Sequence, residues 1–225
     1  RAGGERLVTL AVVPVKALEQ SKSRLLPDLS REQLEALSLA MLTDVLNALL
    51  ATPSVQRVVT LTPDAAVAST SRSLGAEALE RPDDGLNAAI DAAARDLKVD
   101  SATPYLVMLG DVAGARSEEI EELFIALGQQ QSPSAVLAAT TDGGTAALLR
   151  TPHDALPACF GRDSAKRHRA AADAAGIAFR EISLPSLSLD LDSAEDLSSF
   201  TRTETRGTQT HDLLRKLGWG ERRHA

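Results

Sequence analysis

The sequence predicts a single α/β domain built on a mostly parallel, twisted sheet with helices on both faces. Three observations lead to this fold class. Short β-rich runs alternate along the chain with longer runs of helical period, which is the pattern of strand–helix–strand units. The length of 225 residues suits one hydrophobic core. Apolar residues make up 44% of the chain but aromatic residues only 3%, so aliphatic side chains must fill that core.

The predicted strands are short apolar or β-branched runs that end at proline, glycine or polar residues. The first, residues 7–13 (LVTLAVV), is a continuous run of apolar and β-branched residues, as expected of a strand buried on both faces, and Pro14 closes it. The last, residues 187–191, alternates leucine with polar residues, which predicts a strand with one buried face. Between them we expect strands at residues 57–61, 76–79, 105–109, 134–139, 146–149 and 177–182.

The predicted helices begin at capping residues and end at proline or glycine. Ser30 and Gln33 form a capping box for a long helix that Pro53 ends. Thr62 and Pro63 are expected to be the N-cap and first residue of the next helix. Further helices are expected at residues 86–97 and 117–127, from Asp163 or Ser164 to residue 175, directly after Ser193, and at residues 212–217.

Composition limits the classes of partner. We expect residues 1–200 to form one domain and residues 201–225 a docked or mobile tail. The net charge of −7 argues against a broad nucleic-acid surface, and no continuous apolar run reaches the ~18 to 20 residues of a membrane span. One cysteine, Cys159, suits a reducing compartment, so we expect a cytoplasmic protein with no membrane or nucleic-acid partner. A homodimer is compatible with the sequence.

The loop after the first predicted strand is a candidate anion site, because ligands of open parallel sheets bind beyond the carboxyl ends of the strands. It carries Lys16, Lys22 and Arg24, the densest basic cluster of this acidic chain. Lysine point charges and the arginine fork can neutralise a triphosphate. The alternative is a solvated polar loop, since the glycine spacing of a Walker or dinucleotide motif is absent.

Three aspartates follow or lie on predicted strands. Asp111 comes directly after the most hydrophobic strand, and Asp190 and Asp192 fall on one side of the last predicted strand. Three hard oxygen ligands beside nucleotide phosphates suit Mg²⁺. In the alternative interpretation, Asp111 is a turn residue and the other two are solvent-facing acids on an edge strand.

A glycine-rich turn at residues 142–145 and the segment 160–164 form a candidate anion cradle. Their glycines expose backbone N–H groups, Thr145 and Ser164 add hydroxyls, and the helix expected near Ser164 directs its positive end toward the preceding loop. Each feature by itself also fits an ordinary turn or helix cap. We expect His168 to be a surface or packing residue rather than a catalytic one.

Six motifs occur in order: VVPVKALEQSKSRL (12–25), DDGLNAAI (83–90), LGD (109–111), TDGGTAALL (141–149), FGRDSAKRH (160–168) and LDLDSAEDL (189–197). Together they resemble the 2-phospho-L-lactate guanylyltransferase family, known as CofC or FbiD. The resemblance implies a glycosyltransferase A-like nucleotidyltransferase fold. It also implies magnesium-dependent transfer of GMP from GTP to phosphoenolpyruvate, as in the bacterial branch, or to 2-phospho-L-lactate, with release of diphosphate, in coenzyme F(420) biosynthesis.

The resemblance also implies a role for each matching residue. The magnesium ligands would be Asp111, Asp190 and Asp192. The phosphorylated acid would be held at Thr145, Gly161 and Ser164. The GTP phosphates would face Lys16, Lys22 and Arg24, which would supply catalytic charge neutralisation, and the nucleoside would lie near Gly85 and Asn87.

Other functions remain open on the residues alone. One is a nucleotidyltransferase with another acceptor, such as 3-phosphoglycerate, a sugar phosphate or a molybdenum cofactor. A second is a glycosyltransferase that uses Asp190-Leu191-Asp192 as its metal motif, although that motif comes late in this chain. A third is a non-catalytic nucleotide-binding subunit.

Overall fold

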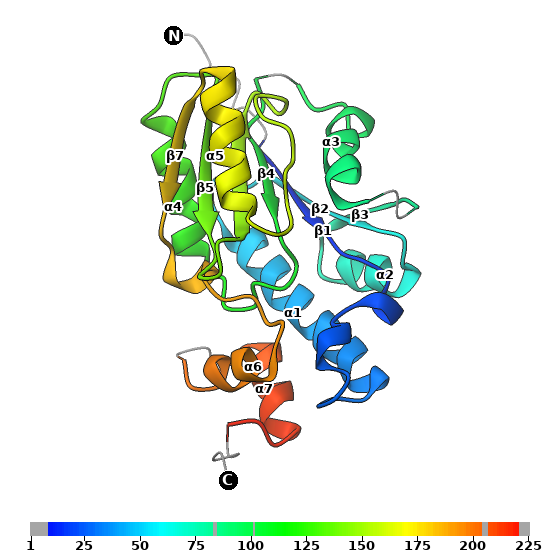
Figure 1. Ribbon diagram of the computed structural model, residues 1–225. Coiled ribbons are helices and arrows are strands. Elements are labelled where there is room, and N and C mark those ends of the chain that lie inside the picture. The colour runs from blue at the N-terminus through cyan, green and yellow to red at the C-terminus, as the bar shows by residue number, and fades with distance from the viewer. Residues whose placement is uncertain (1–8, 83–84, 101, 204–206, 221–225) are drawn as a thin grey trace.

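A seven-stranded sheet with the order β3-β2-β1-β4-β6-β5-β7 forms the centre of the protein (Figure 1). The structure is a computed structural model that describes residues 9–82, 85–100, 102–203 and 207–220. The strands are β1 (Leu10–Pro14), β2 (Arg57–Thr62), β3 (Glu77–Glu80), β4 (Tyr105–Met108), β5 (Ser134–Ala139), β6 (Thr145–Thr151) and β7 (Ala178–Ile182). Strand β6 runs antiparallel to β4 and β5, and the other pairs are parallel. The predicted mostly parallel sheet is confirmed.

Helices cover both faces of the sheet, as predicted. They are α1 (Arg31–Ala51), α2 (Ala65–Ser73), α3 (Leu86–Asp96), α4 (Ser117–Gly128), α5 (Ser164–Ala175), α6 (Ala194–Phe200) and α7 (Gln209–Lys216). Alternate residues of β1 show how the two layers arise, because successive side chains of a strand point to opposite faces. Ala11 and Val13 pack in a core cluster with α1, α2 and α4, whereas Leu10 and Val12 pack in another with α3 and α5.

Helix α1 begins at the predicted capping box. The Ser30 hydroxyl accepts from the Gln33 backbone N–H, and the Gln33 side chain accepts from the Ser30 N–H. Among the described residues, α1 is the helix that is long and apolar enough to cross a membrane by length and composition alone. Its buried residues pack in two clusters of the protein core, so we interpret it as a core helix.

Two element predictions are wrong. Helix α2 is capped by Asp64, whose carboxylate accepts from the backbone N–H groups of Ala66 and Val67, because Thr62 still belongs to β2 and pairs with Glu80. Residues 188–192 follow a short 3-10 helix (Pro185–Leu187) as an irregular segment and not as a strand. Their alternation indicated one buried face, but a strand also needs ladder pairing with a neighbouring strand, and this segment pairs with none of the seven strands of the sheet.

The C-terminal helix α7 lies against α1 and beside α6, below the sheet in the view of Figure 1. The two carboxylate oxygens of Asp44 in α1 each accept 2.8 Å hydrogen bonds, from the backbone N–H groups of Gln209 and Thr210. These contacts satisfy two of the free donors at the start of α7. A third core cluster joins this region: Leu25, Leu29, Leu34, Leu37, Met41, Ala113, Leu191, Leu197, Phe200, Leu214 and Trp219.

Parts of four sequence predictions lie outside the described residues. These are residues 7–8 of the first strand, residues 1–8, 83–84 and 101 of the predicted domain, residues 83–84 of the second motif, and residues 204–206 and 221–225 of the tail.

Candidate active site

The loops after β1 and β4 begin side by side, because these neighbouring strands are parallel and their carboxyl ends meet. Gly110 follows β4, and a Cβ at this position would lie 3.1 Å from Val15 Cγ2 and 3.4 Å from Val13 Cγ1. A larger residue there would push the two loops apart. Glycine therefore allows Asp111 to lie close to the basic loop.

Three aspartates form a cluster at this edge of the sheet. One carboxylate oxygen from each of Asp111, Asp190 and Asp192 lies within 4.8 Å of the others. The Lys22 ammonium donates to Asp111 Oδ2 at 2.8 Å and to Asp192 Oδ1 at 2.6 Å, and Arg24 Nη1 lies 3.5 Å from Asp192 Oδ2. Five of the predicted site residues are thus brought together.

The irregular segment 188–192 still directs two acids into this cluster. Leu191 between them is fully buried and anchors the segment in the third core cluster. The carboxylate of Asp196 accepts from the backbone N–H groups of Asp192, at 3.1 Å, and Ser193, at 2.7 Å, and so fixes the chain where α6 begins. Anchoring by a core leucine and a helix cap replaces the strand pairing that the sequence predicted.

The electrostatics of the cluster favour a bound cation. Partial burial, together with the charges of Asp111, Asp142 and Asp192, raises the pKa of Asp190 to about 6. Burial also acts on Lys22 and would lower its pKa, but the two carboxylates outweigh it and leave the Lys22 pKa above its usual value. Excess negative charge therefore remains beside a lysine that is already paired twice.

These residues fit a hard divalent cation. The Lys22 ammonium stands between Asp111 and Asp192, where positive charge is stabilised. Asp111 Oδ1 is buried and has no hydrogen-bond partner among the described residues, which leaves an oxygen lone pair for a ligand. Carboxylate oxygens are the ligands that Mg²⁺ prefers.

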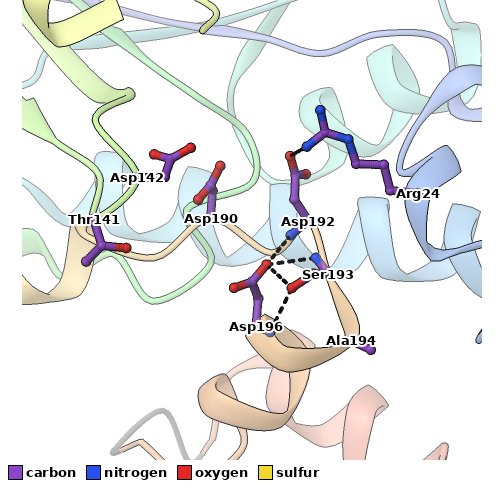
Figure 2. A pocket seen from close by; sticks show the side chains of 8 residues that line it. All are labelled: Arg24, Thr141, Asp142, Asp190, Asp192, Ser193, Ala194 and Asp196. Atoms are coloured by element: carbon purple, nitrogen blue, oxygen red, sulfur yellow. Dashed lines mark hydrogen bonds and ion pairs between the residues drawn. The ribbon is translucent and has the colours of Figure 1, made fainter. Parts of the chain in front are cut away.

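A cavity of about 300 Å³ opens beside the acids (Figure 2). Figure 2 shows the carboxylates of Asp142, Asp190 and Asp192 facing it, with Arg24 reaching Asp192 from another side. Asp142 lies in the turn between β5 and β6, where it accepts from the Thr140 hydroxyl and the Gly144 N–H. These hydrogen bonds, that of Thr140 first, keep the Asp142 pKa below its usual value.

Two of the predicted acceptor residues, Thr145 and Ser164, form a second, buried group next to this turn, whereas Gly161 is exposed. Ser164 Oγ donates to Thr145 Oγ1 at 2.9 Å, and Thr145 Oγ1 lies 3.2 Å from His168 Nδ1. The Ser164 side chain thus bonds across to β6 and does not cap α5. The N-cap of α5 is Asp163. Gly161 has a φ of +113°, and a Cβ there would lie 3.2 Å from Arg167 Nη2.

The remaining predicted residues lie apart from these two groups or are occupied by protein contacts. Lys16 is exposed, and no contact joins it to the acids among the described residues. Asn87, at the start of α3, donates from Nδ2 to the Phe160 carbonyl and accepts from the Phe160 N–H. Gly85 is the N-cap of α3, with a φ of +96°.

The sequence interpretation missed three residues of the site. Asp142 was treated only as part of a turn, although an aspartate before two glycines is also free to face a cavity. For the helix after Ser193 the sequence left Glu195 or Asp196 as the capping partner; it is Asp196, and its carboxylate also accepts from the Asp192 backbone N–H. His168 was expected to be a surface or packing residue. It lies four residues after Ser164 and therefore on the same face of the helix, and this spacing could have indicated that the two residues lie together.

Comparison with known proteins identifies relatives along nearly the whole chain. A family model described as "Guanylyl transferase CofC like" matches residues 9–223. A phosphoenolpyruvate guanylyltransferase of Nocardia farcinica is 37% identical over 222 residues, covering 95% of this chain and 94% of the relative. A 3-phospho-D-glycerate guanylyltransferase of Colwellia psychrerythraea is 31% identical over 208 residues, covering 92% of this chain and 98% of the relative.

Solved structures share the fold at much lower identity. A crystal structure from Desulfovibrio desulfuricans G20, described as a nucleotide-diphospho-sugar transferase, has a TM-score of 0.77 at 16% identity, covering 92% of this chain and 94% of that one. A cytidylyltransferase from Leptospira borgpetersenii has a TM-score of 0.58 at 13% identity, covering 95% of both chains. The likeness supports the predicted nucleotidyltransferase-type fold.

Proposed function

The chain belongs to the family of CofC-like guanylyl transferases, and from this we propose that it transfers GMP from GTP to phosphoenolpyruvate and releases diphosphate. One observation carries the proposal. The three aspartates, Lys22 and Arg24 form one cluster at the edge of the sheet where nucleotides bind in open parallel folds, and Arg24, Asp190 and Asp192 of this cluster line a cavity. Cytoplasmic coenzyme F(420) biosynthesis is the setting we propose for this reaction.

The reaction needs positioning and charge neutralisation more than proton transfer. An oxygen of the acceptor phosphate attacks the α-phosphorus of GTP, the new O–P bond forms, and the bond from the α-phosphorus to the diphosphate oxygen breaks. The attacking oxygen is already ionised at neutral pH, so no side chain has to remove a proton. Catalysis then follows from in-line alignment of the two substrates and from cations near the developing charge.

The protein's own cations perform part of this task. Lys22 and Arg24 neutralise the triphosphate, and Lys16, at the start of the same loop, adds charge at its exposed edge. Asp111, Asp190 and Asp192 would hold Mg²⁺. When bound, this ion supplies Lewis-acid stabilisation of the phosphoryl oxygens.

The two substrates occupy different parts of the site in this proposal. The phosphorylated acid is held by the loops that carry Thr145, Gly161 and Ser164, and the nucleoside lies near Gly85 and Asn87. Asn87 acts by fixing the Phe160 backbone, since both ends of its amide are engaged there. Phosphoenolpyruvate is preferred over 2-phospho-L-lactate and 3-phosphoglycerate because relatives named phosphoenolpyruvate guanylyltransferase are 37% and 34% identical to this chain.

A coupled assay of diphosphate release tests the proposal directly. Purified protein with magnesium is given GTP, ATP, CTP or UTP and each of the three acids in turn. We expect diphosphate release with GTP and phosphoenolpyruvate, and little with the other nucleotides. Release with every nucleotide except GTP, or with none of the three acids, would contradict the proposed function.

Alanine variants test the acceptor subsite. Thr145→Ala and Ser164→Ala are each expected to raise the KM for the acceptor several-fold, because a neutral hydrogen bond contributes ~0.5 to 1.5 kcal/mol and one to a charged group ~1.5 to 3 kcal/mol. The KM for GTP should hardly change. Gly161→Ala should act in the same direction, given its positive φ. Initial rates measured while each substrate is varied in turn provide both constants.

Ser71→Ala is a matched control for these variants. Ser71 is also buried, but its hydroxyl donates only to the Val67 carbonyl within α2. We expect a loss of stability and unchanged KM values for this control. Equal effects of the Thr145 and Ser164 substitutions on both KM values would place the acceptor elsewhere.

A further inference from the structure

His168 lies at the junction of the two loops that form the acceptor subsite. Its ring is fully buried, with Nδ1 3.2 Å from Thr145 Oγ1, and its Nε2 accepts a 2.9 Å hydrogen bond from the Cys159 backbone N–H. Thr145 begins β6, whereas Cys159 leads into the segment that contains Gly161. One side chain on α5 thus joins both loops.

We propose that His168 is a positioning residue for the acceptor, acting in its neutral Nδ1–H tautomer to hold the loops of Thr145 and Gly161 at a fixed separation. The proposal rests on the proposed function, because it specifies how that function's acceptor subsite is built. His168 does not itself touch the reacting atoms in this scheme.

The hydrogen bonds determine the tautomer. The Cys159 N–H is a donor only, so Nε2 must present its lone pair and carries no proton. A neutral imidazole then has its proton on Nδ1, which donates to Thr145 Oγ1. Burial, followed by the positive charge of Arg150, lowers the pKa of His168 to about 4, which is consistent with the neutral ring.

This tautomer also determines which hydrogen bonds the Thr145 hydroxyl accepts and which it can donate. Thr145 Oγ1 accepts from Ser164 Oγ and, by the argument above, from His168 Nδ1. Both lone pairs are then used, and only the hydroxyl proton is left for another group. A third partner of Thr145 must therefore be a hydrogen-bond acceptor, such as an oxygen of a carboxylate or phosphate.

Other contacts make the second loop depend on the same histidine. The Phe160 ring packs edge-on against His168, with 5.2 Å between ring centroids and an interplanar angle of 75°. The Phe160 carbonyl accepts from Asn87 Nδ2 and from Arg167 Nη2, and Arg167 shares helix α5 with His168. The backbone just before Gly161 is thus held by three side chains, of which His168 alone also reaches Thr145.

Three substitutions separate positioning from packing. His168→Phe fills the space but removes both hydrogen bonds, and we expect the acceptor KM to rise about tenfold with the GTP KM unchanged. His168→Asn offers an amide donor near the position of Nδ1, and His168→Gln offers an amide oxygen near the position of Nε2. Each should recover part of the acceptor affinity. Equal changes in both KM values, or no recovery in either amide variant, would overturn the proposal.

His211→Phe is the matched control. His211 is also buried, but it lies in α7, which packs on α1. This variant should lose stability comparably and leave the acceptor KM unchanged. A rise in acceptor KM in the control equal to that in His168→Phe would show a general effect of destabilisation and overturn the proposal.

Nitrogen-15 NMR of histidine-labelled protein tests the tautomer without turnover, with the His168 signals identified by their loss in His168→Phe. We expect a protonated Nδ1 and an unprotonated Nε2 at neutral pH, together with slow hydrogen exchange of the Cys159 amide that becomes fast in His168→Phe. A proton on Nε2 or unchanged exchange would overturn the positioning role. Wild-type protein with this tautomer but no guanylyl transfer would contradict the proposed function and leave the loop contacts established.

Discussion

Asp190→Asn is expected to lower turnover by at least about a hundredfold while making the metal-free protein more stable. Turnover falls because one hard oxygen ligand is lost from the site proposed for Mg²⁺, whose charge stabilises the phosphoryl oxygens. Stability rises because the neutral amide no longer repels Asp111, Asp142 and Asp192, whose charges contribute to the raised pKa of Asp190. The measurements are steady-state turnover with magnesium and denaturant unfolding with a chelator.

The gain in stability should depend on pH. The Asp190 pKa is about 6 in the folded protein, above its usual value of 3.8. Protonated Asp190 therefore contributes to the free energy of unfolding. This contribution is fully present below pH 3.8 and is lost as the pH rises through about 6. Asp190→Asn should match the wild type in acid and exceed it above pH 6. Comparing the two proteins at each pH removes the opposite contribution of His168, whose pKa is lowered.

Glu195→Gln provides a matched control, since it makes the same chemical change at an exposed position just beyond the acids. We expect turnover and stability close to wild type. Asp192→Asn should also lose at least about a hundredfold in turnover, but without the gain in stability, because Asp192 pairs with Lys22 and Arg24. If neither aspartate variant loses turnover, the acids have no metal role.

Lys22→Met should give the second largest effect. Removal of the ammonium leaves Asp111 and Asp192 without their shared cation. The metal-free protein should therefore lose about 1 to 3 kcal/mol of unfolding free energy. The lower end of this range allows for the solvent exposure of Asp192. Magnesium should then stabilise the variant more than the wild type, since the ammonium no longer competes for the carboxylates. Turnover should fall because positive charge near the triphosphate is lost.

Thermal unfolding with and without magnesium measures this difference. Lys166→Met removes the same charge from an exposed position on α5 and should leave stability, magnesium response and turnover unchanged. An equal magnesium response in Lys22→Met and wild type would show that Lys22 and the ion do not share a site.

The sequence predicted which acids come together better than it predicted how. Asp111 was placed correctly because the preceding strand β4 is fully apolar apart from the Tyr105 hydroxyl and ends at Met108, just before Gly110. Asp190 and Asp192 were assigned to a strand, yet they reach Asp111 from an irregular segment held by Leu191 and Asp196. Leucine alternation reports burial of one face, whereas strand pairing depends on neighbours distant in the chain.

Partners of buried polar groups were harder to predict. Thr145, Ser164 and His168 are joined across 19 and 23 positions of the chain. Local rules rank Ser164 as a helix cap, because a serine near a helix start usually bonds the nearby backbone. The preference was overridden by a long-range contact between β6 and α5, which only the packed structure contains.

The third core cluster links the acids to helix α7. Leu25 follows Arg24, Ala113 lies two residues after Asp111, and Leu191 separates the other two aspartates. These anchors pack in the same cluster as Leu214 and Trp219. During synthesis, the packing beneath the acids is therefore completed only after α7 has been made and has docked against α1. A chain that ends before α7 carries every predicted ligand but lacks the support that holds them in register.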